Sequence, residues 1–246
     1  MRLLLLNPNT TAAVTDLLLA AARTVAAPGT ELIPATAPRG VPYIATRAEA
    51  VLGGAVALEM LAEAEGLDGA IVAAFGDPGL GGARELFDFP VVGMAEAAML
   101  TACMLGRRFS IVTFAQALEP WYAEAVEWNG LSGRCAAIRC LDGAFRDIAE
   151  VQEEKEALLV DLAARTVAED RADVVILAGA PLAGLAARVA DRVPVPLVDG
   201  VQAAVKQAEA LVSLRSRKAT AGSYRRPAPK PSLGLPPSLA RRISHG

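Results

Sequence analysis

Ile71-Val-Ala-Ala-Phe-Gly-Asp-Pro-Gly-Leu80 is an apolar run that breaks into a Gly/Pro turn, and it returns as Val175-Ile-Leu-Ala-Gly-Ala-Pro-Leu-Ala-Gly184. Aligning the two turns pairs Ala74 with Gly179, an offset of 179 − 74 = 105 residues. In both copies the turn leads into an Ala-rich segment that is typical of a helix. Repeated strand–turn–helix units build parallel sheets with crossover helices, so this unit indicates an α/β fold.

Two further pieces repeat at nearly the same distance. The run Leu3 to Asn7 matches Phe109 to Thr113, since 113 − 7 = 106, and the run at Pro90 matches that at Pro196, since 196 − 90 = 106. Three matches in one order and at one offset indicate a duplicated half, and so long a period means two similar domains. We predict two pseudo-symmetric parallel-sheet α/β lobes with the ligand cleft between them.

The domain boundaries follow from this repeat and from a change in composition near the end of the chain. The first lobe is expected at residues 1–100 and the second at 101–212, with the last helix able to cross back to the first lobe. Strands are expected at 2–6, 31–33, 70–74, 91–94, 109–112, 174–177 and 197–198. Helices are expected at 12–26, 46–66, 118–129, 151–169 and 201–214, with a further helix that ends at 100–105.

The composition favours a cytoplasmic protein that needs no cofactor. Of 246 residues 53% are hydrophobic, yet no apolar run reaches the roughly 18 residues of a membrane span. Three cysteines (Cys103, Cys135 and Cys140) and a single histidine, His245, have no metal-ligand spacing. A disulfide scaffold and a zinc site are both unexpected. We expect a small-molecule substrate, no metal, no membrane partner and a homo-oligomer.

Residues 213–246 form a basic, proline-rich strap. They hold eight of the 24 Lys and Arg residues and no acid, so the body carries 24 − 8 = 16 basic against 27 acidic residues, near −11. Such a segment could bind nucleic acid, but Tyr224 is its only aromatic residue for stacking. We expect the strap to pack against the acidic body and to bind no nucleic acid.

The loop Asn7-Pro-Asn-Thr-Thr11 stands between a strand and a helix. Its backbone N–H groups and the helix end suit a carboxylate or a polarised amide carbonyl in the cleft. A plain N-cap with an Asx-turn would use the same residues. Thr113, at the equivalent point of the second half, makes a paired site more plausible.

Asp77 is the only ionisable side chain in the Phe75–Leu80 turn. It could be a general base if burial raises its pKa, or it could cap the following helix, which would lower its pKa. Glu96 follows the fourth strand, and its counterpart in the repeat is Gln202, which suggests a hydrogen-bonding role. Tyr43 could line the cleft or pack, and Trp121 and Trp128 are expected in the core or an interface.

The motifs Asn7-Pro-Asn-Thr-Thr, Phe75-Gly-Asp-Pro-Gly-Leu, Gly93-Met-Ala-Glu-Ala-Ala and Arg108-Phe-Ser-Ile-Val-Thr resemble the hydantoin and allantoin racemase branch of the aspartate/glutamate racemase superfamily. The resemblance runs from Met1 to about Lys230. It implies two pseudo-symmetric α/β halves around a substrate cleft. It also implies two cysteines, one in each facing turn, that remove and return a proton on opposite sides of the substrate's α-carbon.

The chain departs from that pattern at both catalytic positions. Ala74 and Gly179 stand where the resemblance implies the two thiols, and neither can hold a proton. No role transfers to the three cysteines, which lie elsewhere in the pattern. Asp77 is the candidate catalytic residue. The candidate substrate-binding residues are Asn7, Asn9, Thr10, Thr11, Tyr43, Phe75, Gly76, Glu96, Thr113, Phe114, Ala180 and Pro181.

Three functions stay open from the sequence. The chain could be a racemase with unexpected bases. It could be an isomerase- or lyase-type enzyme that acts on a small carboxylate or cyclic amide without the two-cysteine mechanism, which we favour. It could also be a non-catalytic ligand-binding relative of the racemases, as the loss of both thiols would suggest.

Overall fold

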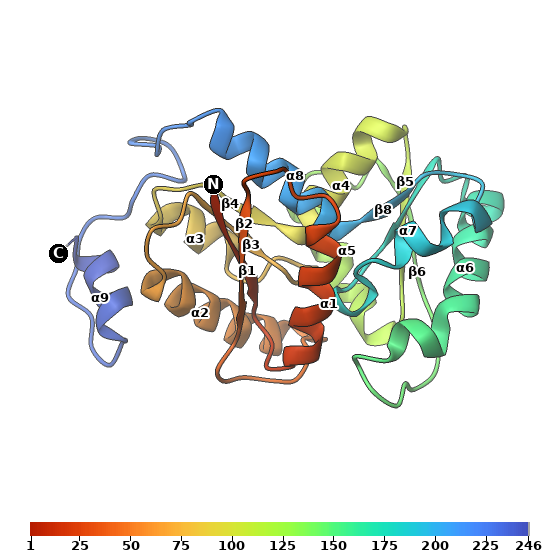
Figure 1. Ribbon diagram of the computed structural model, residues 1–246, viewed down its shortest axis with the longest axis horizontal. Helices are drawn as coiled ribbons and strands as arrows, with labels where there is room; N and C mark the ends of the chain where they lie inside the picture. Colours follow the sequence, from red (N-terminus) through yellow and green to blue (C-terminus); the bar gives the residue numbers. More distant parts are fainter. Residues whose placement is uncertain (246) are drawn as a thin grey trace.

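The computed structural model describes residues 1–245, which form two four-stranded parallel sheets (Figure 1). The first sheet has the order β2-β1-β3-β4, with β1 at Arg2–Asn7, β2 at Glu31–Thr36, β3 at Gly69–Val72 and β4 at Val91–Gly93. The second has the order β6-β5-β7-β8, with β5 at Phe109–Thr113, β6 at Cys135–Cys140, β7 at Val174–Leu177 and β8 at Leu197–Asp199. The central strands are buried along their length, as apolar runs in parallel sheets usually are.

The register of the strands confirms the duplication. Leu6 pairs with Val72 in the first sheet, and Val112 pairs with Leu177 in the second. The offsets are 112 − 6 = 106 and 177 − 72 = 105, as in the sequence repeat. The two-lobe α/β prediction is therefore confirmed at the level of individual residue pairs.

Helices surround both sheets. They are α1 Ala12–Arg23, α2 Arg47–Glu63, α3 Leu80–Leu86, α4 Met94–Leu105, α5 Glu119–Trp128, α6 Val151–Asp170, α7 Leu185–Val189, α8 Gly200–Ser213 and α9 Pro237–Ser244. Short 3₁₀ turns occupy Gln116–Leu118, Ala180–Leu182 and Ala190–Arg192. Helix α2 begins where Thr46 and Glu49 form a capping box. Helix α1 ends three residues before the predicted boundary, and β2 runs three residues further than predicted.

The two lobes exchange their last helices. Helix α4 follows β4 of the first sheet but packs against β7 and β8 of the second. Helix α8 follows β8 but packs against β3, β4 and α1. The two helices also pack against each other, so the lobes interlock and their strand ends face a shared space.

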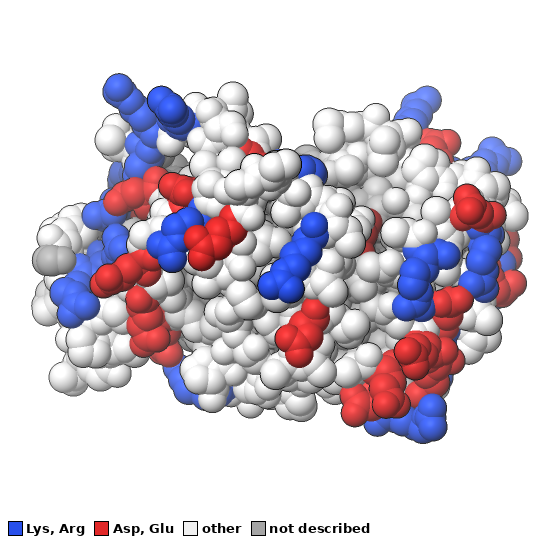
Figure 2. Space-filling model, viewed as in Figure 1, with Lys and Arg blue, Asp and Glu red and all other residues white. Residues whose placement is uncertain are grey.

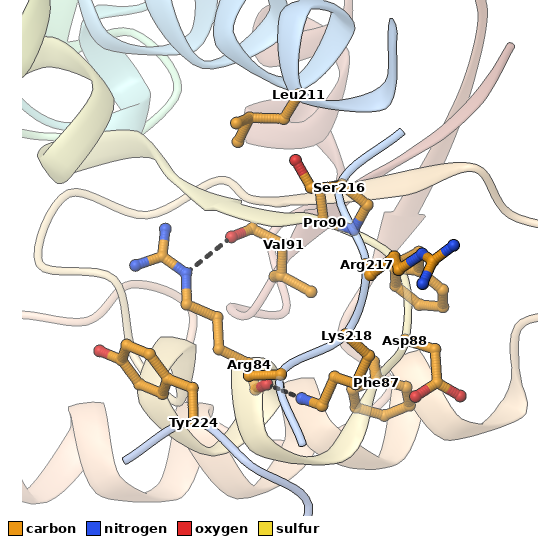
Figure 3. A pocket seen from close by; sticks show the side chains of 12 residues that line it. Arg84, Phe87, Asp88, Pro90, Val91, Leu211, Ser216, Arg217, Lys218 and Tyr224 are labelled. Carbon is orange, nitrogen blue, oxygen red and sulfur yellow. Dashed lines mark hydrogen bonds between the residues drawn. The ribbon is translucent and has the colours of Figure 1, made fainter. Parts of the chain in front are cut away.

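The C-terminal strap packs on the first lobe. Lys218 donates to the backbone carbonyl of Arg84 (Figure 3), and Arg226 pairs with Asp88 at 2.6 Å. The Arg242 guanidinium lies 5.4 Å from the centroid of the Phe87 ring. Figure 2 shows basic side chains over this end of the molecule with acidic ones beside them. The expected packing is thus observed, but the strap is not extended throughout, because Pro237 starts helix α9.

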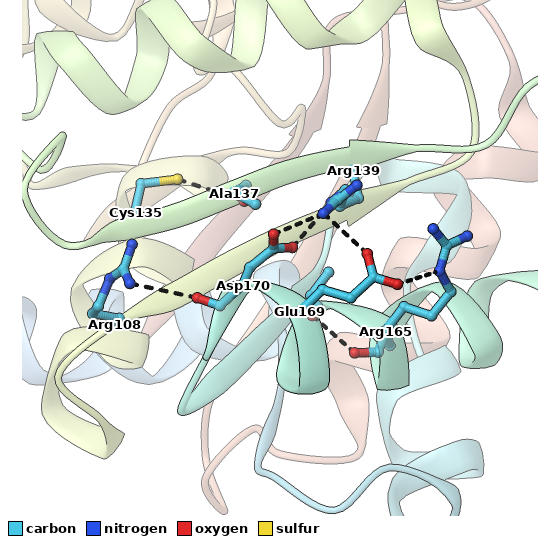
Figure 4. Close-up of polar contacts among 9 residues, drawn as sticks. Arg108, Cys135, Ala137, Arg139, Arg165, Glu169 and Asp170 are labelled. Carbon is cyan, nitrogen blue, oxygen red and sulfur yellow. Dashed lines mark hydrogen bonds and ion pairs between the residues drawn. The ribbon is translucent and has the colours of Figure 1, made fainter.

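Ion pairs hold the C-terminal end of α6 in the second lobe. Arg139 of β6 binds Asp170 at 2.7 Å and Glu169 at 3.3 Å (Figure 4). These contacts hold the C-terminal end of α6 against β6. Within residues 1–245, no helix is both long and apolar enough to cross a membrane.

Candidate functional site

A cavity of about 30 Å³ lies where the carboxyl ends of the central strands of both sheets meet. Ala74 and Phe75 reach it from the turn after β3, and Gly179, Ala180 and Pro181 from the turn after β7. The two positions without a thiol therefore line one space, as the repeat predicted. This is the edge at which parallel α/β sheets bind ligands.

Five of the twelve residues that line the cavity are aromatic. Tyr43, Phe75, Phe114, Trp121 and Tyr122 all line the cavity. The rings of Phe75 and Tyr122 lie 4.8 Å apart between centroids, so the wall joins the two lobes. None of the twelve described residues that line it carries an acidic or basic side chain. The site is therefore suited to a flat, uncharged ligand.

Asn9 supplies the polar end of the cavity. Its Oδ1 accepts from the Thr11 N–H at 3.0 Å and from Asn7 Nδ2 at 3.1 Å. These two bonds fix the amide so that its NH₂ group, which has no partner among residues 1–245, is the part available to a ligand. An amide NH₂ donates to a carbonyl oxygen.

Asn7, Thr10 and Thr11 support the site instead of lining it. Asn7 is fully buried, and its Nδ2 also donates to Thr15 Oγ1 at 3.0 Å. The Thr10 N–H donates to the Val41 carbonyl at 3.0 Å, and the Thr11 hydroxyl to the Pro42 carbonyl at 2.6 Å. These bonds hold the loop that delivers Tyr43. The motif was predicted to contact ligand directly, and in the structure Asn9 is its one side chain that lines the cavity.

Tyr122 stands beside Gly179. A Cβ atom at position 179 would lie 3.6 Å from the Tyr122 hydroxyl and 2.8 Å from Phe114 Cε1. Burial raises the pKa of the Tyr122 phenol, while a hydrogen bond with Thr113 lowers it. The phenol thus stays protonated at neutral pH. Thr113 lies beneath the cavity, where its hydroxyl donates to the Ala178 carbonyl at 2.9 Å.

Asp77 does not line this cavity. Its Oδ1 and Oδ2 accept from the N–H groups of Ala95 and Glu96, both at 2.8 Å, so it caps helix α4. Burial raises the pKa of the Asp77 carboxyl to about 7, against those two hydrogen bonds, which lower it. Asp77 also does not cap the following helix, α3, which was the alternative to a role as a base. The N-cap of α3 is the left-handed Gly79. A Cβ at Gly93 would lie 2.3 Å from Asp77 Cγ, so the glycine makes room for this cap.

In the second lobe, a carboxylate from a different position caps the last helix. Asp199, at the position equivalent to Gly93, caps α8 through the N–H groups of Val201 and Gln202, at 3.0 and 3.1 Å. Its other oxygen accepts from the Gly184 N–H in the turn after β7. A carboxylate thus ties the turn after the third strand to the last helix in both lobes, which favours the structural role of Asp77.

We predict that Asp77→Ala lowers the free energy of unfolding by about 1–2 kcal/mol, because α4 loses the acceptor of two N–H groups. Turnover should change little, since Asp77 lies outside the cavity lining. Urea denaturation and turnover would be measured beside Asp88→Ala, a matched exposed acid whose loss should cost about 0.5 kcal/mol or less. A stable Asp77→Ala protein with at least 100-fold slower turnover would instead identify Asp77 as a base.

Some of the other candidate site residues line the cavity, and others lie elsewhere. Asn9, Tyr43, Phe75, Phe114, Ala180 and Pro181 line the cavity as expected. Glu96 does not, because it binds Arg84, whose Nη1 lies 2.9 Å from Glu96 Oε1. Gly76 faces a separate pocket with Asp77. Sequence reasoning missed Ile44, Leu118, Trp121 and Tyr122, although the last three recur at helical spacing on one face of a predicted helix.

The three cysteines lie outside the cavity lining. Cys135 and Cys140 open and close β6, and burial raises their thiol pKa values to about 11 and about 12. Cys135 Sγ faces the Ala137 carbonyl at 3.6 Å (Figure 4). A thiol with so high a pKa is a poor nucleophile or base at neutral pH.

Comparison with known proteins identifies close relatives. The sequence model of the Asp/Glu/Hydantoin racemase family matches residues 3–208. A hydantoin racemase of Pseudomonas sp. (strain NS671) is 32% identical over 243 residues, covering 98% of both chains. One from Paenarthrobacter aurescens is 34% identical, covering 95% of this chain and 100% of its own.

Solved structures of related proteins also superimpose on this chain. Allantoin racemase from Klebsiella pneumoniae superimposes with a TM-score of 0.92 at 35% identity, covering 97% of this chain and 98% of that one. Arylmalonate decarboxylase superimposes with a TM-score of 0.60 at 16% identity, which shows a shared fold alone.

Proposed function

The chain belongs to the Asp/Glu/Hydantoin racemase family, and from that premise we propose that it moves a proton on a small, uncharged cyclic amide of the hydantoin type. The proton would leave and return at the ring carbon next to a carbonyl, without catalytic thiols. We infer this substrate class from the lining of the cavity, which is rich in aromatic side chains and holds no charged one. A free dicarboxylate would need a cationic partner, whereas a neutral ring needs stacking surfaces and hydrogen bonds.

Two donors in the cavity support the reaction. When the ring C–H bond breaks, its electron pair spreads onto the neighbouring carbonyl oxygen, and donors aimed at that oxygen lower the barrier. The Asn9 NH₂ group and the Tyr122 phenol line the cavity and can serve as those donors. In our proposal a water molecule accepts the ring proton. Return of a proton to either face then gives either enantiomer.

We predict that Asn9→Asp slows solvent deuterium exchange at C5 of L-5-methylhydantoin by about 100-fold, the usual cost of losing one such donor. The aspartate keeps the oxygen that accepts from Thr11 and Asn7, so the fold should survive, but the NH₂ donor is gone. Proton NMR in D₂O would measure the loss of the C5–H signal, with the buffer rate subtracted.

The pH profile of wild-type exchange separates the proposal from its rivals. Because water is the base and the cavity lining holds no acidic or basic side chain, the exchange rate should not depend on pH once the buffer rate is subtracted. A plateau that begins near pH 7 and disappears in Asp77→Asn would assign the base to Asp77 instead, whose pKa is about 7. Tight binding of the hydantoin with exchange at the buffer rate would favour the non-catalytic alternative.

Self-association and a cytoplasmic location belong to the same proposal. Leu100, Met104 and Leu105 on α4 are 42%, 77% and 53% exposed. A second copy packed on α4 would bury them, which supports the expected homo-oligomer.

A further inference from the structure

Trp121 forms a wall shared by two spaces. On one side is the 30 Å³ cavity, and on the other is a pocket of about 250 Å³, called here the outer pocket. The outer pocket lies between the turn after β3 in the first lobe and α5 in the second. Its lining includes Gly76, Asp77, Trp121, Glu124, Trp128 and Asn129.

The small cavity cannot hold a substituted ring by itself. A cavity of about 30 Å³ has room for roughly two water molecules, so the ring and anything attached to it need additional room. The outer pocket is the space directly behind the Trp121 indole. A shift of this one side chain would join the two volumes.

The turn after β3 is shaped around that indole. A Cβ atom at Gly76 would lie 2.3 Å from Trp121 Cζ2, and Gly76 has φ +122°, so a glycine allows the ring to lie over the turn. Trp121 and Trp128 are seven residues apart, which places both on one face of α5. Trp121 is 8% exposed and Trp128 is 80% exposed, so the two indoles lead from the cavity to the surface.

We propose that the outer pocket holds the substituent on the substrate's ring and selects uncharged aromatic groups, with Trp121 as the movable partition. This inference rests on the function proposed above. The two indoles offer stacking surfaces. Asp77 and Glu124 are the ionisable side chains of the lining, and no basic side chain of the described chain joins them there, so an anionic substituent is rejected. Arg47 is not among the lining residues, and its guanidinium is paired with Glu124 at 2.6 Å.

The test compares three ligands that differ only in the substituent: 5-benzylhydantoin, 5-methylhydantoin and the anionic 5-carboxymethylhydantoin. Isothermal titration should give the wild-type protein a preference for the benzyl over the methyl compound and the weakest binding for the anion. Trp128→Ala should reduce the ratio of benzyl to methyl affinity by about 5- to 10-fold, the worth of one aromatic pair. Leu158→Ala changes an exposed apolar residue on α6 that lies outside the pocket lining, and it is the control.

Fluorescence tests the partition itself. The chain has two tryptophans, so Trp128→Phe leaves Trp121 as the only indole. Its emission should shift more on binding 5-benzylhydantoin than on binding 5-methylhydantoin. If 5-methylhydantoin binds but Trp128→Ala leaves the affinity ratio at the wild-type value, or the benzyl compound is excluded, the inference is overturned and the proposed function stands. If none of the three hydantoins binds, both are overturned.

Discussion

Ala74→Cys is expected to accelerate C5 deuterium exchange of L-5-methylhydantoin by about 100-fold or more. Position 74 lines the cavity and already carries a Cβ, so the new thiol reaches the site where the family resemblance implies a base. A positioned acid–base side chain usually contributes about 100- to 10,000-fold. The proton on the ring would then pass to a thiolate instead of to water. The gain should grow with pH as the thiolate fraction rises.

Ala74→Ser is the control, since its hydroxyl has nearly the same size and no useful basicity. Exchange would be followed by proton NMR at several pH values for both variants and the wild type. Equal rates for the cysteine and serine variants, in proteins that bind the hydantoin, would contradict the idea that position 74 faces the reacting carbon.

Gly179→Cys, the matching change in the second lobe, is expected to cost about 1–3 kcal/mol of folding stability. Gly179 has φ +118°, a conformation in which an L side chain is strained. Its new Cβ would also lie 2.8 Å from Phe114 Cε1, so that ring must shift. Ala74→Cys carries neither penalty and should be clearly less destabilised. The two facing positions are therefore unequal, although the repeat pairs them.

Gly179→Ala separates the two contributions because it adds the Cβ without the sulfur. Urea denaturation of Gly179→Ala, Gly179→Cys and Ala74→Cys would measure them together. If Gly179→Ala is as stable as the wild type, the left-handed backbone at this turn is not a constraint, and the second lobe could accept a thiol as readily as the first.

The sequence predicted the fold at the level of strands because the repeat is a property of the strand ends. The pairs Leu6–Val72 and Val112–Leu177 reproduce the 105- and 106-residue offsets. The racemase family was also predicted correctly. The helix at Pro237 was missed because prolines indicated an extended strap, although a proline at the first turn also starts helices. The last helix, α8, packs against the first lobe, to which the sequence analysis allowed it to cross, and α4 packs against the second lobe in the same way.

The site was harder to predict than the fold. Asp77 was the candidate catalytic residue, with a cap of the nearest helix as the alternative. In the structure it has φ +52° and reaches across to α4, which begins 17 residues further on. Asn7, Thr10 and Thr11 have the side chains of a ligand-binding loop, yet their hydrogen bonds go to the protein. Trp121 and Tyr122 were missed because an aromatic residue on a helix usually signals a core, and only the second lobe's position relative to the first brings them to the cavity.

Deuterium exchange by a cysteine-free protein tests the central claim most directly. Cys103, Cys135 and Cys140 would be changed together to serine, and C5–H loss from L-5-methylhydantoin would be compared with the wild type in D₂O. We expect both proteins to exchange the proton faster than buffer and at rates within about twofold of each other, because none of the three thiols lines the cavity. Loss of exchange in a cysteine-free protein that still folds and binds the hydantoin would show that a thiol does the work, and would contradict the account.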